Sequence, residues 1–167
     1  MITDIHKGDY GTEGKVRWEL FDMEIDVGID NGVSVEYAEK CAEALNSLSD
    51  KLIKEIFEAA KRYCLFFIDL CGDEWDDWNE MSFKVTKKTP AEKLKSEITP
   101  TSLIVNKPKD DRIGFRIGGS CTWDDEHGIE IAILDGKLVY LGAFEGHSAW
   151  SDFKADDEWN FVNGLEK

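Results

Sequence analysis

Alternation of apolar and polar residues predicts two short strands near the start of the chain. Two runs show this period of two: Val16, Trp18 and Leu20, and then Met23, Ile25 and Val27. Such spacing places every second side chain on one face of a strand. The runs are close enough in sequence to pair as an N-terminal β-hairpin. Residues 1–14, which contain three glycines, are expected to form an irregular lead-in.

Helical periodicity follows the hairpin. Apolar residues recur three or four positions apart within residues 35–45, and they form a broader stripe within residues 52–71. Ser34 and Ser49 precede these stretches as candidate N-caps, because a serine hydroxyl can accept a hydrogen bond from a free N–H of the first turn. Gly72 can end the second stretch in a left-handed conformation. The pattern therefore predicts two consecutive helices.

A short helix and a set of strands are predicted in the second half. Residues 89–92 read Thr-Pro-Ala-Glu, which offers a capping hydroxyl, a proline at the first helical position and a returning glutamate. Alternation then resumes in residues 101–105, 113–123, 129–133 and 138–142. The Asp135-Gly136 pair between the last two runs is a strong hairpin signal.

This order of elements predicts a single α+β domain over residues 1–167. It would contain the N-terminal β-hairpin, two consecutive helices, a short helix and then an antiparallel β-meander, with the strands forming one sheet. Residues 143–167 are treated as a C-terminal extension whose placement the pattern leaves open. Four large aromatic residues in it need burial: Trp150, Phe153, Trp159 and Phe161.

The net charge of the chain limits the kinds of molecule that the protein is expected to bind. The chain has 35 acidic and 20 basic side chains, which gives a formal net charge of −15 at pH 7. Binding to nucleic acid or to an anionic membrane is therefore not expected, because neutralising phosphates requires clustered Lys and Arg. A basic protein partner fits this charge, although an acidic surface can also serve solubility alone. One stretch is locally basic and is interpreted as a solvated helix face: Lys84, Lys87, Lys88, Lys93 and Lys95.

The location predicted for the protein is the cytoplasm. No apolar run approaches the roughly 20 residues that span a bilayer, and the first residues lack the basic and apolar regions of a secretory signal. The four cysteines show no C-x-x-C spacing, which is typical of buried thiols in a reducing compartment. No cofactor is expected.

The segment from Trp123 to Gly128 is the one place where carboxylates crowd beside a histidine. Asp124, Glu126 and His127 could ligate a divalent cation or supply an acid/base pair. No second histidine stands at ligand spacing, however, and neighbours along a strand point to opposite faces. We therefore interpret the segment as a polar turn. In this turn an aspartate accepts backbone N–H bonds, His127 bonds a carbonyl, and Gly128 has a positive φ. A metal or ligand site is kept as the alternative.

An acidic loop with two tryptophans is the main candidate for partner binding. Residues 73–80 contain five acidic residues and no basic one. Exposed tryptophans in such a field would suit a basic protein surface, whereas buried ones would cover the end of the second helix. The candidate residues are Asp73, Glu74, Trp75, Asp76, Asp77 and Trp78. Residues 156–159 repeat this chemistry and could extend the same face.

The late hairpin reads C-x-W-x-x-E-H-G from Cys121 to Gly128. With the tryptophan-containing N-terminal hairpin and the two helices, it resembles a group of small, mostly uncharacterised bacterial proteins classed as a domain of unknown function. The resemblance extends from about Trp18 to Gly142. Some proteins of this kind look like components of toxin–immunity neighbourhoods, which implies binding without catalysis, and the resemblance supplies no catalytic residues.

The sequence thus predicts a non-enzymatic, acidic protein-binding domain of immunity type in the bacterial cytoplasm. Its expected partner is a basic protein such as a toxin. The alternative is a module that binds a divalent metal or a small ligand, or an unrecognised enzyme, centred on the turn from Trp123 to Gly128.

Overall fold

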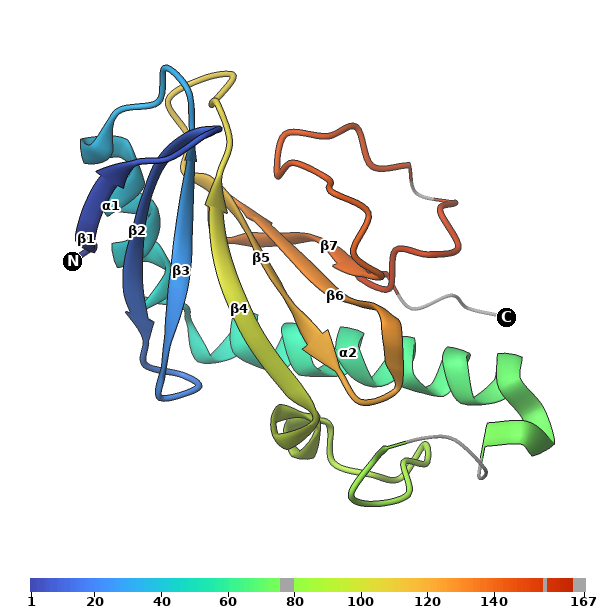
Figure 1. Cartoon of the computed structure of the whole chain (residues 1–167). Helices are drawn as coiled ribbons and strands as arrows, with labels where there is room; N and C mark the ends of the chain where they lie inside the picture. The colour runs from blue at the N-terminus through green and yellow to red at the C-terminus, as the bar shows by residue number, and fades with distance from the viewer. Residues whose placement is uncertain (76–79, 155, 164–167) are drawn as a thin grey trace.

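The computed structural model describes residues 1–75, 80–154 and 156–163. Its strands form a seven-stranded sheet in which the spatial order follows the chain order (Figure 1). The strands are β1 (Thr3–Lys7), β2 (Gly11–Trp18), β3 (Met23–Asp30), β4 (Ile98–Val105), β5 (Gly114–Cys121), β6 (Asp124–Leu134) and β7 (Lys137–Gly142). The helical segments are α1 (Val35–Leu45), α2 (Asp50–Cys71) and the 3-10 helices η1 (Gly72–Glu74) and η2 (Ala91–Glu97).

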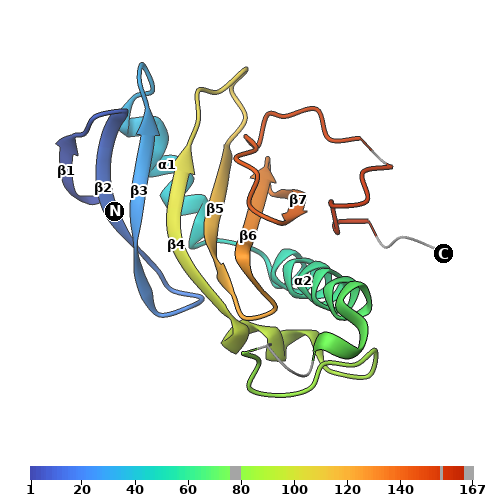
Figure 2. The same cartoon turned by 45° about the vertical axis from the view of Figure 1, so that its right-hand side comes forward.

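All four helical segments lie between β3 and β4 in the chain. The helices α1 and α2 cover one face of the sheet, and η2 lies at the end where β4 begins (Figures 1 and 2). Ser34 caps α1 by accepting a hydrogen bond from the N–H of Tyr37, and Ser49 caps α2 in the same way from Leu52. The alternating residues predicted in the N-terminal hairpin face these helices, so Trp18 and Ile25 are at most 2% exposed. This covered face holds the main hydrophobic core.

The predicted architecture is wrong about the direction in which the strands pair. β3 and β4 pair in parallel, with Val27 opposite Leu103, so the sheet is mixed and not an antiparallel meander added to a hairpin. Parallel neighbours need a long crossover connection, which α1 and α2 supply here. The N-terminal hairpin itself is confirmed, because β2 pairs antiparallel with β3, and all seven strands do belong to one sheet.

The predicted irregular lead-in is also wrong. Residues 3–7 form β1, and residues 11–14 begin β2. Every side chain of β1 is exposed, so its residues carry no apolar alternation that a sequence pattern could reveal. This edge strand is held by backbone pairing with β2, for example Thr3 with Lys15.

The helical part departs from the prediction as well, since the described residues form two α-helices and two 3-10 helices. The short helix expected after Thr89 is the 3-10 helix η2, and Pro90 occupies its N-cap position without a side-chain cap. The Thr89 hydroxyl instead accepts a hydrogen bond from the N–H of Thr86, at 2.9 Å. The capping box is therefore not formed, because the hydroxyl closes the preceding turn. No helix within the described residues is long and apolar enough to cross a membrane.

The C-terminal residues cover the second face of the sheet over β6 and β7 (Figure 1). Trp150 packs there with Ala132 and Tyr140. The Asn160 side chain then bonds the outer edge of β7, donating to the carbonyl of Val139 at 2.9 Å and accepting from the N–H of Leu141 at 3.3 Å. A covered edge cannot pair with another chain, so this segment also protects one end of the sheet.

Candidate functional site

The turn between β5 and β6 is organised around Asp124. This carboxylate is 1% exposed, and it accepts hydrogen bonds from the Tyr63 hydroxyl at 2.5 Å and from the backbone N–H of His127 at 3.0 Å. The Nδ1 atom of His127 also lies 3.0 Å from it. Burial and the bond to Asp124 raise the pKa of Tyr63, so the phenol stays protonated and donates. Asp124 therefore ties the turn to α2.

Gly128 has the positive φ that the sequence predicts, at +67°. A Cβ atom there would lie 2.4 Å from the carbonyl oxygen of Gly119, so any larger residue would clash with the neighbouring strand. His127, by contrast, does not use its ring to bond a carbonyl as expected. Its Nδ1 is turned onto Asp124, because the buried carboxylate is a stronger acceptor than a neutral carbonyl.

The metal alternative for Asp124, Glu126 and His127 gains no support from this geometry. Asp124 already bonds Tyr63 and His127, and Glu126 is exposed on the strand. Within residues 1–75, 80–154 and 156–163, no group of three His, Cys, Asp or Glu side chains is placed to hold a metal ion. Asp124 and Gly128 do show the backbone hydrogen bond and the positive φ expected of the predicted polar turn, but both residues belong to strand β6, and the turn itself is confined to residues 122–123.

His127 should titrate above its usual pKa. The hydrogen bond from its ring to Asp124 raises the pKa above 6.5, and the ring is about half exposed. A folded pKa above the unfolded one means that this contact stabilises the fold fully below about pH 6.5 and that the gain is lost as the pH rises through the folded pKa. We expect the NMR titration of His127 to return towards 6.5 in Asp124→Asn. An unchanged His127 pKa in that variant would contradict the assignment of the hydrogen bond.

A second buried carboxylate, Glu130, holds the C-terminal residues on the sheet. It is fully buried, and the Arg116 guanidinium donates to it at 2.6 Å. The backbone N–H groups of Gly146 and His147 donate to it at 3.1 and 2.9 Å, and His147 Nδ1 lies 3.0 Å away. This cluster was not among the sites predicted from the sequence. Its signal was one charged residue within each of two otherwise uncharged stretches, Arg116 in residues 113–119 and Glu130 in residues 128–134.

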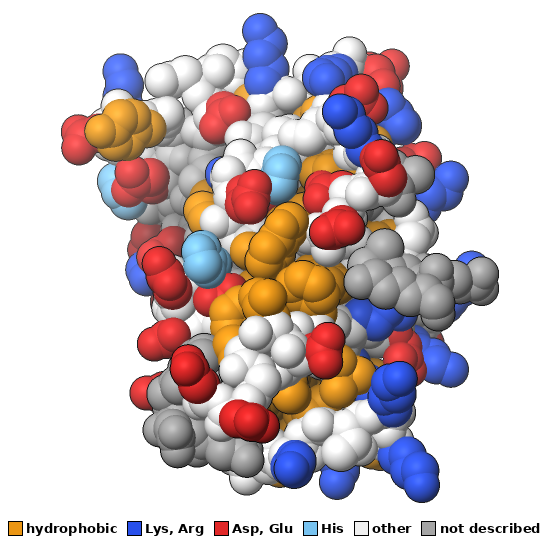
Figure 3. Space-filling view, turned by 90° about the vertical axis from the view of Figure 1, so that its right-hand side faces the viewer, with side chains coloured by type: hydrophobic (Ala, Val, Ile, Leu, Met, Phe, Trp, Pro, Cys, Tyr) orange, Lys and Arg blue, Asp and Glu red, His pale blue; other side chains and the backbone are white. Residues whose placement is uncertain are grey.

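The histidine held by Glu130 also forms part of a surface hollow of about 510 Å³. We call it the acidic aromatic hollow, and its lining residues are His147, Ser151, Asp152, Phe153, Lys154, Asp156, Asp157, Glu158 and Trp159. Apolar and acidic side chains gather on this side of the molecule (Figure 3). The hollow thus combines aromatic surface with four carboxylates and one ammonium group.

The aromatic residues of the hollow pack against other aromatic rings of the protein. Phe153 stacks on the buried ring of Tyr140, with centroids 5.3 Å apart, and His147 meets Phe153 edge-on at 5.3 Å. Trp159 meets Phe66 of α2 edge-on at 5.2 Å and is 40% exposed. The expectation that all four C-terminal aromatic residues need burial is therefore wrong for Trp159. Its indole ring packs against Phe66 and is partly exposed to solvent.

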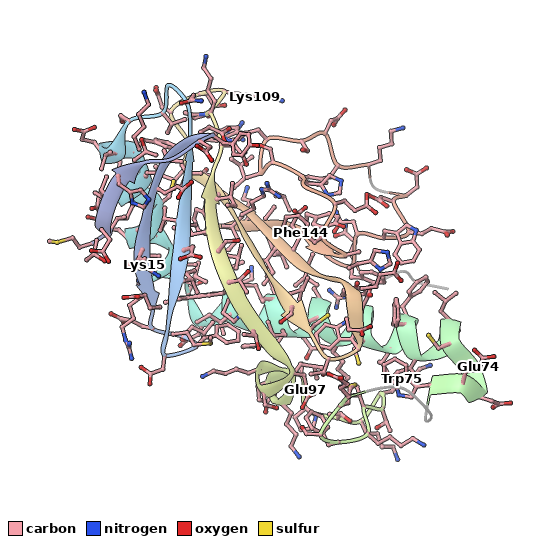
Figure 4. The ribbon with its side chains drawn as sticks, viewed as in Figure 1. Lys15, Glu74, Trp75, Glu97, Lys109 and Phe144 are labelled. Atoms are coloured by element: carbon pink, nitrogen blue, oxygen red, sulfur yellow. The ribbon has the colours of Figure 1, made fainter. Side chains whose placement is uncertain are left out.

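The partner-binding residues predicted in the loop after α2 do not include an exposed tryptophan among the described residues. Trp75 is only 7% exposed and packs against Phe67, with centroids 6.4 Å apart, so it covers the end of α2. Asp73 and Glu74 are exposed, and Figure 4 shows Trp75 turned inward and Glu74 outward. Asp76, Asp77 and Trp78 lie outside the described residues. Trp75 thus follows the alternative in which the tryptophan is buried and covers the end of the second helix.

Comparison with known protein families gives a match. Residues 1–148 match the model of a family described as Domain of unknown function (DUF6985). No curated protein and no solved structure matches the chain. The matched stretch includes Asp124, Glu130 and His147, whereas the rest of the acidic aromatic hollow lies beyond it.

Proposed function

The chain belongs to the DUF6985 family, whose function is unknown, and we propose that its acidic aromatic hollow binds a basic segment of a partner protein. The observation that carries the proposal is Trp159, which is 40% exposed beside the carboxylates of the hollow. Exposed tryptophans that are supported from behind are the side chains that most often dominate the binding energy of protein interfaces.

The negative charge of the hollow favours a positively charged partner. Four carboxylates and one lysine line it, and the whole chain carries a net charge of −15, so a cationic segment is attracted both locally and at longer range. The faces of Trp159 and Phe153 can also receive an ammonium or guanidinium group through cation–π contact. Acidic and aromatic groups together therefore favour lysine and arginine side chains over neutral ones.

This arrangement supports a non-enzymatic role of the immunity type. An acidic domain can inhibit a basic toxin by presenting carboxylates where the toxin would bind phosphate groups. The support consists of the net charge, the exposed tryptophan and the resemblance of the hairpin to that of bacterial proteins found near toxins. The partner in this proposal is a basic toxin in the bacterial cytoplasm.

Trp159→Ala is expected to weaken binding to a basic partner by about 30-fold, which corresponds to the roughly 2 kcal/mol typical of a dominant interface residue. A defined probe is an arginine-rich peptide, with an equally long glutamate-rich peptide as the negative probe. Affinity by isothermal titration calorimetry should also fall as salt is raised, because added salt screens the carboxylates.

The matched control is Tyr10→Ala, which removes an aromatic ring that is 89% exposed near the opposite edge of the sheet. It should leave the affinity for the arginine-rich peptide unchanged. Affinity capture from the source organism should recover a basic protein with the wild type and with Tyr10→Ala, but not with Trp159→Ala. Equal affinity of the wild type, Tyr10→Ala and Trp159→Ala for the arginine-rich peptide would contradict the proposal.

A further inference from the structure

A second hollow is lined by residues of η2 and of the connection between β2 and β3. Figure 1 shows these two segments at the same end of the sheet. The volume of the hollow is about 680 Å³. We call it the lysine-lined hollow, and its lining residues are Phe21, Met23, Phe83, Glu92, Lys93, Lys95, Ser96 and Ile98. Four of these side chains are apolar, and together they give the hollow a mainly apolar surface. Its size falls within the roughly 300–1,000 Å³ typical of sites for small molecules.

The lining of this hollow contains two lysines and one glutamate, so it is slightly basic although the chain as a whole is acidic. Residues 84–95 contain five lysines and one glutamate, and both Lys93 and Lys95 are exposed at the rim. This is the stretch that the sequence pattern indicates to be a solvated helix face. The structure instead places two of its ammonium groups beside apolar surface.

One of these ammonium groups is already held against the apolar wall. Lys95 Nζ lies 5.9 Å from the ring centroid of Phe21, which is within cation–π distance. The Phe21 ring packs in turn on the buried Trp18, with centroids 4.7 Å apart. A cation is therefore positioned over a fixed aromatic surface.

We propose that the lysine-lined hollow binds a small organic anion with an apolar body. The anionic head would pair with Lys93 and Lys95, and the body would cover Phe21, Met23 and Phe83. Charge complementarity supports this occupant, because a chain of net charge −15 repels anions except where basic side chains gather. Burial of the apolar body supplies the attraction that two exposed lysines would not provide alone.

The fluorescent aromatic sulfonate 8-anilinonaphthalene-1-sulfonate is a suitable probe, used with the full folded chain. Its fluorescence should rise and saturate in the presence of the wild-type protein. The double variant Lys93→Ala/Lys95→Ala should weaken its affinity about tenfold, because two charge-assisted contacts are lost. Glu92→Gln should strengthen it about threefold, since the one carboxylate in the lining is neutralised.

The matched control is Lys7→Ala/Lys137→Ala, which removes two exposed lysines from β1 and β7. It should bind the probe like the wild type, and so should Trp159→Ala, which separates this site from the acidic aromatic hollow. Octanoate should displace the probe, and octylammonium should not. Equal displacement by both, or unchanged binding in Lys93→Ala/Lys95→Ala, would overturn the proposal.

Discussion

Replacing Glu130 by alanine is expected to lower the free energy of unfolding by about 3–5 kcal/mol, the cost of removing one partner from a buried ion pair. Arg116, whose side chain is 13% exposed, would keep its charge without its 2.6 Å partner. The N–H groups of Gly146 and His147 would lose their acceptor at the same time. Urea denaturation followed by circular dichroism measures the change.

The same substitution should release the C-terminal residues from the sheet, because Glu130 joins β6 to the start of that segment. Limited proteolysis should then cut the variant faster than the wild type between residues 144 and 159. Glu126→Ala is the matched control, since Glu126 is an exposed glutamate on the same strand. It should change stability by no more than about 0.5 kcal/mol. A loss below 1 kcal/mol in Glu130→Ala would contradict the role assigned to this carboxylate.

Replacing Trp123 by alanine is expected to cost about 3–5 kcal/mol of unfolding free energy, as for other large aromatic residues removed from a core. Trp123 is fully buried and meets the Tyr63 ring edge-on, with centroids 5.7 Å apart. Tyr63 holds Asp124 through its hydroxyl, so the cavity would also disturb the start of β6, which contains His127. Thermal and urea unfolding measure the loss.

Trp159→Ala makes the same chemical change at a surface position and is the control for Trp123→Ala. Because Trp159 is 40% exposed, its loss should cost at least about 2 kcal/mol less than the loss of Trp123. Comparable losses in the two variants would show that Trp159 belongs to the core and would remove the basis for the proposed interface. The pair thus separates a tryptophan that stabilises the fold from one that is available to a partner.

Local features of the structure could be predicted because they depend on residues near one another in the chain. The serine caps at Ser34 and Ser49 form as expected, since the hydroxyl and the N–H that it caps are only three residues apart. The positive φ of Gly128 is equally local. The hairpin of β2 and β3 follows from alternation and a short connection.

Features that depend on distant partners were missed or misplaced. Edge strand β1 carries no apolar alternation, since all of its side chains are exposed and its main contacts are the backbone pairing with β2. One local prediction also failed: the capping box after Thr89 does not form, because the hydroxyl accepts a hydrogen bond from the N–H of Thr86 instead. Tryptophans in acidic surroundings looked alike in sequence, yet Trp75 is buried against α2 and Trp159 is partly exposed.

The sequence by itself therefore determined the caps at Ser34 and Ser49, the N-terminal hairpin, the positive φ of Gly128 and the acidic net charge. Only the tertiary structure decided the parallel pairing of β3 with β4, the contact of Glu130 with Arg116 and His147, and the exposure of Trp159. The physical reason is the range of the interactions involved. A cap or a turn is completed within a few residues, whereas strand neighbours, buried ion pairs and exposed rings are set by segments far apart in the chain.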